Sequence, residues 1–184
     1  NISIIYNGSY VGSGVYIANS SPIMNTMLIA ENNPSEFGSI SIWYNSEPIL
    51  SNVTIVNNLI NSNSNSGGGL SSFYGANPLL INSIIGWNGG NKNLHIQGYE
   101  DWGWPSNSGQ GSIRIYNSNI QDEHASLDSD NLLYIDDILI EGENNILDDP
   151  LFVSIDEKNY NLSSNSPCVD AGTAYFEYQN EVLL

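Results

Sequence analysis

The chain has 184 residues, of which 20 are Asp or Glu and only 3 are Lys or Arg, so its formal net charge is −17 at pH 7. This shortage of positive charge argues against binding to nucleic acid or to an anionic membrane surface. No run of 18 apolar residues exists, so no membrane-spanning segment is predicted. Cys168 is the single cysteine, which excludes a disulfide within the chain and a cysteine metal cluster.

The charge is unevenly distributed along the chain. Residues 1–91 contain three acidic residues and no Lys or Arg, whereas residues 92–184 contain the other 17 acidic residues and all three basic ones. Abundant Asn, Ser and Gly suit a turn-rich β-protein that is secreted or displayed at the cell surface. The chain opens inside an expected strand, Ile2 to Tyr6, and we therefore expect it to be a processed or truncated piece of a longer protein.

An eleven-residue unit recurs three times, at Pro22–Asn32, Pro48–Asn58 and Pro78–Asn88. Its starting prolines are 26 and 30 residues apart, and a period of about 20 to 50 residues indicates a solenoid, a propeller or an array. No 10- to 15-residue helical pattern separates the short apolar runs, which argues against a βαβ array. The spacing favours the coils of a parallel β-helix.

Stacked coils place equivalent side chains on top of one another. The eighth position of the unit is Ile29, Ile55 or Ile85, and we expect these residues to form an aliphatic ladder inside the coil. The fifth position is Asn52 or Asn82 in two of the units, and we expect an amide ladder there that satisfies backbone groups of the turn.

The predicted strands before the third unit include Val15–Ile17 and Ser39–Trp43, and the alternation in the latter points Ile40 and Ile42 inward. The regularity breaks at residues 89–111, which we interpret as a long insertion containing one strand, Asn93–Gln97. The insertion also contains aromatic side chains beside carboxylates, a combination suited to binding a sugar ring, although the tryptophans could equally cover the core. These residues are Tyr99, Glu100, Asp101, Trp102 and Trp104.

A fourth coil is expected at residues 112–121. Ile113 and Ile115 would face the interior, which leaves Arg114 and Tyr116 outside. Arg114 and Tyr116 could extend the glycan platform, and Arg114 could serve as a catalytic base, but a lone arginine on a strand is more often a surface ion-pair partner. The apolar patches of the acidic segment that follows, residues 122–149, are expected to continue the stack, giving four or five coils in all.

Metal binding is predicted at one position only. Asp128 and Asp130 alternate like the oxygen ligands of a calcium loop, although the glycine and the terminal glutamate of an EF-hand are missing. The alternative is a solvated acidic loop with no bound cofactor.

The end of the chain carries three motifs, Asp149–Phe152, Tyr160–Leu162 and Ser166–Gly172. With the repeated proline-led coil, they resemble the C-terminal part of secreted bacterial right-handed parallel β-helix proteins of the pectate-lyase-like superfold. The resemblance implies an all-β, right-handed parallel β-helix in a single domain. Residues 1–142 would form the coils, and residues 143–184 would form an irregular C-terminal capping segment.

Two functions follow from the sequence. The first is a non-catalytic extracellular or cell-surface module with a structural, adhesive or self-assembling role, since no catalytic constellation is evident and open coil ends can associate. The second is a polysaccharide-binding or polysaccharide-degrading protein that uses the 99–104 segment and Arg114. The implied partners are another copy of the chain or a glycan.

Overall fold

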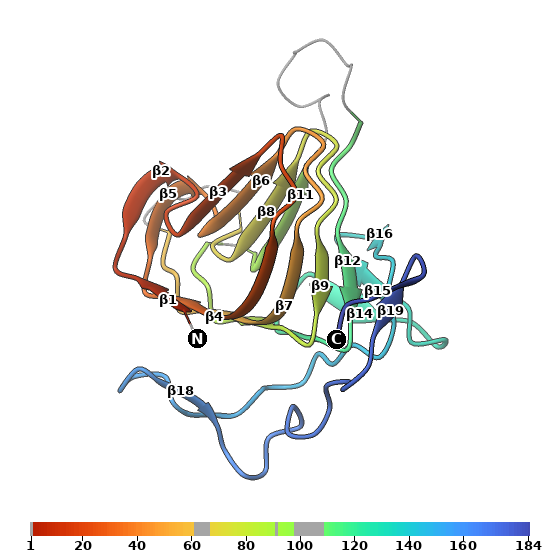
Figure 1. Ribbon diagram of the computed structural model, residues 1–184. Helices are drawn as coiled ribbons and strands as arrows, with labels where there is room; N and C mark the ends of the chain where they lie inside the picture. The colour runs from red at the N-terminus through yellow and green to blue at the C-terminus, as the bar shows by residue number, and fades with distance from the viewer. Residues whose placement is uncertain (1, 61–66, 91, 98–108) are drawn as a thin grey trace.

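The structure is a computed structural model that describes residues 2–60, 67–90, 92–97 and 109–184. It is all-β, and its parallel strands stack into a β-solenoid of about three turns (Figure 1). The predicted fold class is therefore confirmed, with fewer coils than the four or five expected. Within the described residues no helix occurs that is long and apolar enough to cross a membrane.

Three parallel sheets form the walls of the solenoid. The largest runs in the order β1-β4-β7-β10-β13, with β9 pairing with β7 and β12 pairing with β9. A four-stranded sheet runs β3-β6-β8-β11, and β2 pairs with β5 on a third wall. The strands of these sheets are β1 (Ile2–Ile5), β2 (Gly8–Val11), β3 (Val15–Ala18), β4 (Ile23–Ala30), β5 (Asn33–Phe37), β6 (Ile40–Trp43), β7 (Ile49–Val56), β8 (Leu70–Phe73), β9 (Leu79–Ile81), β10 (Ile84–Gly86), β11 (Leu94–Gln97), β12 (Arg114–Tyr116) and β13 (Asn119–Ile120).

The predicted aliphatic ladder is confirmed. Ile29 pairs with Ile55, and Ile55 pairs with Ile85, in parallel register. All three side chains are fully buried, and so are those of Ile40 and Ile42 on the opposite wall. Burying an aliphatic side chain contributes about 1.5–3 kcal/mol, so this column is the main stabilising feature of the stack.

The asparagine ladder lies at a different position from the one predicted. Asn52 donates from its amide to Asn25 Oδ1 (3.2 Å), and Asn82 donates to the carbonyl of Thr173 (2.8 Å). Both have φ near +50°, Asn52 within β7 and Asn82 in the bend between β9 and β10. The buried ladder is formed instead by the eleventh position of the unit, through Asn32, Asn58 and Asn88.

This ladder is continuous through the interior. Asn32 Nδ2 donates to Asn58 Oδ1 (3.0 Å), and Asn58 Nδ2 donates to Asn88 Oδ1 (2.7 Å). Asn88 Nδ2 in turn donates to Asn93 Oδ1 (2.9 Å). Each of the three repeat asparagines also donates to a backbone carbonyl of the preceding coil, at Ile4, Ile29 and Ile55 respectively. These hydrogen bonds pair buried polar groups at the corner of each coil.

The last coil is covered by a small antiparallel sheet. The apolar patches of residues 122–140 do not continue the stack as expected, because they form the antiparallel order β14-β15-β16. Leu133, Ile135 and Ile140 from this region join the main core cluster and close the end of the column. The strands are β14 (Ala125–Leu127), β15 (Leu133–Ile135) and β16 (Ile138–Leu139). Residues 141–146 then return to the stack through parallel bridges of Glu141 to Arg114 and of Ile146 to Asn119.

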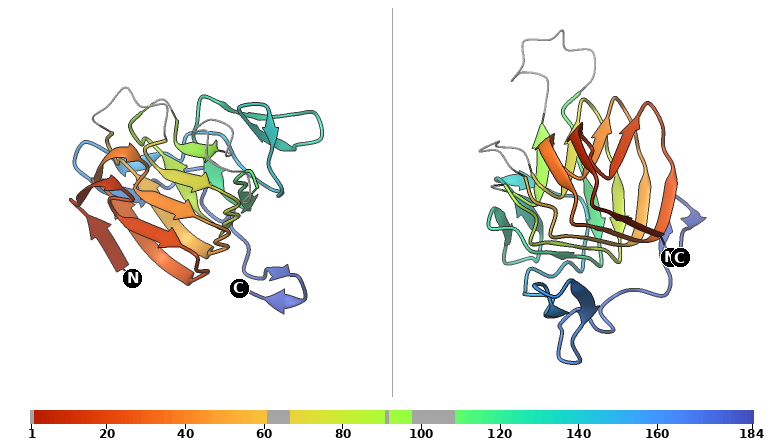
Figure 2. Two further views of the ribbon diagram at one scale, coloured as in Figure 1. Left: turned by 90° about the horizontal axis from the view of Figure 1, so that it is seen from above. Right: turned by 90° about the vertical axis from the view of Figure 1, so that its left-hand side faces the viewer.

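The remaining C-terminal segment runs back along the outside of the coils. Figure 1 and Figure 2 show it, in blue, outside the stack, and Figure 1 places β18 below β1 and β4. It contains two antiparallel pairs, β17 (Phe152–Ser154) with β18 (Asn159–Leu162) and β19 (Glu177–Tyr178) with β20 (Glu181–Val182). This segment positions the candidate site.

Candidate functional site

A groove separates the outer face of the largest sheet from the C-terminal segment. Its floor is a row of outward-facing side chains in parallel register, formed by Ser3, Leu28, Thr54, Ile84 and Asn119. These residues point outward because their strand neighbours, such as Ile29 and Ile55, fill the core. The row therefore offers both hydroxyl and aliphatic groups along the axis of the stack.

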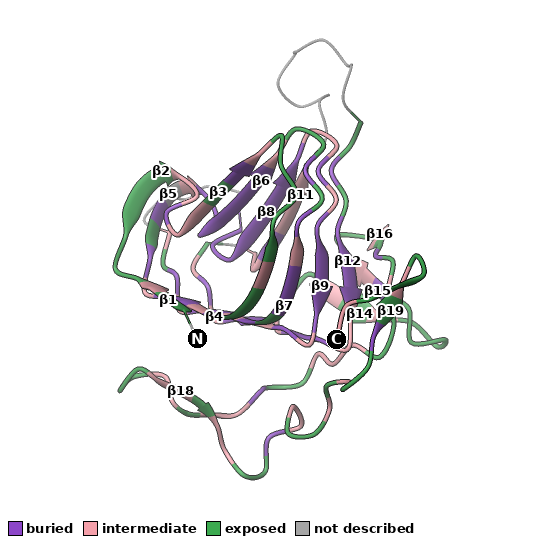
Figure 3. Ribbon diagram, in the orientation of Figure 1, coloured by how far each residue is buried: buried purple, intermediate pink, exposed green. Residues whose placement is uncertain are grey.

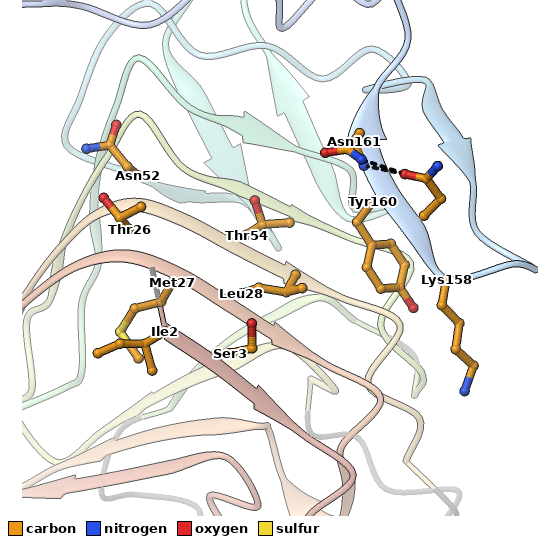
Figure 4. Close-up of a pocket in the computed structure, with 11 residues that line it drawn as sticks. Ile2, Ser3, Thr26, Met27, Leu28, Asn52, Thr54, Lys158, Tyr160 and Asn161 are labelled. Carbon is orange, nitrogen blue, oxygen red and sulfur yellow. Dashed lines mark hydrogen bonds between the residues drawn. The ribbon is translucent and has the colours of Figure 1, made fainter.

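Two adjoining cavities make up the groove. The first has a volume of about 570 Å³ and lies between the floor residues Ser3, Leu28 and Thr54 and the β18 region (Figure 4). The second, of about 390 Å³, lies between Ile84 and the segment from Cys168 to Ala174. Both cavities touch Asn52, and together they extend along the outer face of several coils.

Residues at which the backbone of successive coils changes direction form one rim of this groove. Thr26, Asn52, Asn82 and Asn117 adopt the left-handed backbone conformation, with φ between 50° and 56°. Asparagine tolerates this conformation better than most residues, which explains its recurrence at the fifth position of the unit. These four residues present amide and hydroxyl groups to the groove in successive coils.

The opposite rim is held in place by a polar cluster around Glu31. Tyr160 from β18 donates its hydroxyl hydrogen to Glu31 Oε1. Asn57 Nδ2 donates to the same oxygen (2.8 Å), and Lys158 Nζ is 3.1 Å from Glu31 Oε2. Lys158 also donates to the hydroxyl of Tyr6 (3.1 Å) and lies over its ring. Three segments of the chain thus meet at the Glu31 carboxylate, and Tyr6 from a fourth joins them through Lys158.

The pKa values in this cluster reflect that arrangement. Burial and the hydrogen bond to Glu31 raise the pKa of Tyr160 to about 12. Burial works against ionisation of Glu31, but the hydrogen bonds from Tyr160, Lys158 and Asn57 outweigh it and lower the pKa of the carboxyl group. Glu31 is therefore a carboxylate and Tyr160 a neutral phenol over the whole physiological range.

The second cavity is bounded by a direct link between the floor and the C-terminal segment. Asn82 Oδ1 accepts a hydrogen bond from the backbone N–H of Thr173 (2.9 Å), and its amide donates to the carbonyl of the same residue (2.8 Å). Through these two hydrogen bonds the Asn82 side chain pairs with the backbone of Thr173 in the way that a neighbouring strand would. Burial raises the pKa of the Cys168 thiol in the wall, so the thiol stays protonated.

Arg114 and Tyr116 face away from the coil interior, as predicted, but they are covered by the C-terminal hairpin, which β19 and β20 form. The Arg114 guanidinium donates to the carbonyl of Asn77 (2.6 Å) and to the hydroxyl of Tyr178 (2.9 Å), and lies over the Tyr178 ring at 5.0 Å. It also forms an ion pair with Glu47 at 3.4 Å. Tyr116 contacts the rings of Phe176 and Tyr178 and donates to Glu141 (3.1 Å). These contacts give both residues a structural role in docking the hairpin.

The other predicted site residues lie elsewhere. Asp128 and Asp130 lie in the exposed connection between β14 and β15, where Asp128 Oδ1 accepts the backbone N–H groups of Asp130 and Leu132, both at 2.9 Å. No group of three or more metal-ligating side chains occurs within the described residues, and calcium binding stays a prediction. The glycan platform of Tyr99, Glu100, Asp101, Trp102 and Trp104 lies outside the described residues.

An aromatic cluster on the β3-β6-β8-β11 wall was not anticipated. Tyr44 and Tyr74 stack in adjacent coils, with centroids 5.5 Å apart and an interplanar angle of 13°. Trp43 joins them at 5.1 Å from Tyr74, and Phe73 lies 4.9 Å from Trp43. The signal was present in the sequence, because Trp43-Tyr44 and Phe73-Tyr74 are equivalent pairs at the ends of the strands β6 and β8.

Each of the three basic side chains is engaged with a carboxylate. Lys92 pairs with Asp136 at 2.5 Å, Arg114 with Glu47 and Lys158 with Glu31. A β-helix lyase that acts on uronates needs a free basic group to remove the α-proton of the sugar. The groove therefore offers no unpaired Lys or Arg as such a base.

The comparisons with known proteins found no match. No protein-family model matches the chain, no curated protein matches it, and no solved structure matches it. The parallel solenoid is thus established by the structure itself, while the resemblance to pectate-lyase-like proteins remains an expectation from sequence.

Proposed function

We propose that the chain is a non-catalytic, adhesive module that acts outside the cell or at its surface and binds a neutral polysaccharide in the groove beneath the C-terminal segment. The observation that carries this proposal is the continuous row of Ser3, Leu28, Thr54 and Ile84 along the groove floor. Sugar rings have apolar faces and hydroxyl edges, and this alternation offers a partner for each.

The charge of the groove favours a neutral glycan over an acidic one. Among the described residues that line its two cavities, Lys158 and Asp170 are the charged ones, and the Lys158 ammonium is already neutralised by Glu31. The net charge of −17 repels polyuronates and sulfated glycans at long range. A neutral polysaccharide needs no free basic side chain and is not repelled by the net charge of the protein.

The ionisable groups support binding without cleavage. Glycoside hydrolysis generally needs two carboxyl groups placed on either side of the scissile bond. Asp170 is the carboxylate among the described residues that line the groove, and it is exposed at one end. This arrangement does not favour the degrading alternative.

Affinity electrophoresis tests the proposal. The protein should migrate more slowly in gels that contain a soluble neutral glucan or mannan and normally in gels that contain polygalacturonate. Thr54→Trp, which fills the floor of the groove, should abolish the retardation. Ser126→Trp, on the exposed part of β14, is the matched control and should retain it.

Two results would contradict the proposal. One is unchanged retardation of Thr54→Trp, which would place binding outside the groove. The other is the release of reducing ends or of unsaturated products from any bound polysaccharide, which would show that the protein is an enzyme.

A further inference from the structure

Two tyrosines occupy equivalent corners of successive coils. Tyr44 follows β6 and Tyr74 follows β8, where the chain changes direction toward β7 and β9. The backbone N–H of Asn45 donates to the carbonyl of Tyr74 (3.2 Å), so a hydrogen bond joins the two corners directly. Figure 3 shows β6 and β8 largely buried and the connections after them in part exposed. Tyr44 is 37% exposed and Tyr74 is half-buried, so reagents in solution have access to this corner.

Tyrosine is not the residue that the backbone favours at this corner. Tyr44 has a φ of 56° and Tyr74 a φ of 53°, a left-handed conformation that bulky side chains rarely adopt. The equivalent residue of the preceding coil is Asn19, with a φ of 50°, and asparagine visits this conformation routinely. The backbone therefore does not account for two successive tyrosines, and strained positions of this kind point to a role of the side chains.

The rings of the two tyrosines lie one above the other. Their centroids are 5.5 Å apart and their planes differ by 13°, which is an offset stack. Trp43 packs against both rings, with centroid distances of 5.7 Å to Tyr44 and 5.1 Å to Tyr74. The other tyrosine pair in ring contact among the described residues, Tyr116 and Tyr178, has planes 62° apart, and both of its hydroxyls donate to one carboxylate. The parallel arrangement thus distinguishes Tyr44 and Tyr74.

We propose that Tyr44 and Tyr74 are a site of oxidative cross-linking, at which a peroxidase and hydrogen peroxide join the two rings through a carbon–carbon bond. Each phenol gives up one electron and one proton, and the two phenoxyl radicals couple at ring carbons next to the carbon that carries oxygen. The hydrogens on the two coupled carbons then move to the phenolic oxygens, which restores both aromatic rings. One molecule of hydrogen peroxide takes up the two electrons and two protons and becomes two molecules of water.

The new bond connects two successive coils covalently. Cys168 is the single cysteine, so no disulfide within the chain can do so. A link between residues 44 and 74 closes a loop in the unfolded chain, as a disulfide does, and it stabilises the fold by restricting that chain. The inference is independent of glycan binding, because the groove lies on the outer face of the largest sheet and the tyrosines follow strands of the β3-β6-β8-β11 sheet.

Treatment of the 184-residue protein with a peroxidase and hydrogen peroxide tests the inference. The expected product shows dityrosine fluorescence and still migrates as a monomer on a denaturing gel. Glu47 lies between the two tyrosines, so proteolysis at glutamate separates their peptides unless they are linked. Mass spectrometry should find the two peptides joined, with a mass two hydrogens below their sum. The midpoint of unfolding in urea should rise on oxidation.

Conservative substitutions assign the link to this pair. Tyr44→Phe and Tyr74→Phe each keep a ring in the stack but remove a phenol, and both should lose the linked peptides and the rise in the urea midpoint. Tyr16→Phe is the matched control, because Tyr16 belongs to the same aromatic cluster, with its ring 6.3 Å from that of Trp43. This variant should retain both effects.

Several outcomes would overturn the inference. One is the absence of dityrosine under conditions in which the same peroxidase couples free N-acetyltyrosine. Another is cross-linking only between molecules, seen as dimers on the denaturing gel. A link within the chain that persists in both Tyr44→Phe and Tyr74→Phe would belong to a different pair. Circular dichroism of the variants must match the wild type, and if one of the two misfolds, the other decides the question alone.

Discussion

Asn58 donates its side-chain amide to Asn88 Oδ1 at 2.7 Å inside the solenoid, and Asn58 has no exposed surface. The same amide also donates to the carbonyl of Ile29 (2.9 Å), while Asn58 Oδ1 accepts from the backbone and the side chain of Asn32. One side chain therefore satisfies backbone groups in neighbouring coils.

Replacing Asn58 should destabilise the fold more than any exposed asparagine. Asn58→Ala removes the acceptor of the buried backbone N–H of Asn32 and the donors to Asn88 Oδ1 and to the carbonyl of Ile29, and an unsatisfied buried group costs about 1–3 kcal/mol. We expect the free energy of unfolding in urea to fall by about 3 kcal/mol or more. Asn25→Ala, an exposed asparagine of β4, should change it by less than about 0.5 kcal/mol. Equal effects of the two substitutions would contradict the importance of the buried ladder.

Docking of the β17–β18 region should depend on pH at both ends of the scale. The pKa of Glu31 is lowered in the folded protein from its ordinary 4.5, so its contribution is present above that pH and is lost as the pH falls through the lowered value. The pKa of Tyr160 is raised from 10.0 to about 12, so its contribution is present below pH 10 and is lost as the pH rises toward 12. Hydrogen exchange of residues 150–163 should therefore be slowest between these limits, relative to exchange in β7.

Tyr160→Phe provides the control for this pH dependence. It removes the hydroxyl that donates to Glu31 and keeps the ring that contacts Phe152. The acceleration that Tyr160 causes between pH 10 and pH 12 should disappear in the variant, and exchange at pH 7 should be modestly faster. If wild type and variant lose protection equally at high pH, ionisation of Tyr160 does not release the segment.

Arg114 should act as an anchor for the C-terminal hairpin. Arg114→Met removes the donors to the carbonyl of Asn77 and the hydroxyl of Tyr178, and hydrogen bonds from a charged group contribute about 1.5–3 kcal/mol each. Limited proteolysis should then cut residues 175–184 faster than in the wild type, with the coils intact. Arg114→Lys retains the charge but not the forked geometry, and it should give intermediate protection. Unchanged cleavage in Arg114→Met would assign docking to the ring contacts of Tyr116 and Phe176 alone.

Calcium should have little effect on stability. Asp128 Oδ1 already accepts two backbone N–H groups, and the described residues contain no group of three ligating side chains. A ligand that binds only the folded state raises its stability in proportion to the logarithm of its concentration over the dissociation constant. We expect millimolar calcium or a chelator to shift the unfolding temperature by less than about 1 °C. A larger rise that Asp128→Asn abolishes would establish the predicted site.

The sequence repeat was sufficient to predict the solenoid and its core, because aliphatic residues one coil apart must stack. The repeat did not show which asparagine position of the unit, the fifth or the eleventh, forms the buried ladder. Asn52 and Asn82 recur with the same 30-residue spacing as Asn58 and Asn88, and only the path of the backbone decides which column is buried. The later position follows a left-handed residue in each coil, Glu31, Asn57 or Trp87, which turns the next side chain inward.

The groove could not be predicted from local pattern. Its floor belongs to the repeat, but its second wall is formed by a segment that returns across the coils from more than 100 residues away, as in the bond of Asn57 to Tyr160. The same holds for Arg114. The alternation of the strand correctly placed it outside the coil, but the residue that covers it, Tyr178, lies 64 residues later in the chain. Non-local contacts of this kind leave no periodic signal in the sequence.

The most direct test of the proposed function is hydrogen exchange of the wild-type protein with and without a saturating neutral oligosaccharide, taken from the polysaccharide that retards it most. The groove predicts slower exchange confined to residues around 26–28, 52–54 and 158–161, with β8 and β12 unchanged. Slower exchange on the β3-β6-β8-β11 wall, or in no part of the groove, would contradict the account.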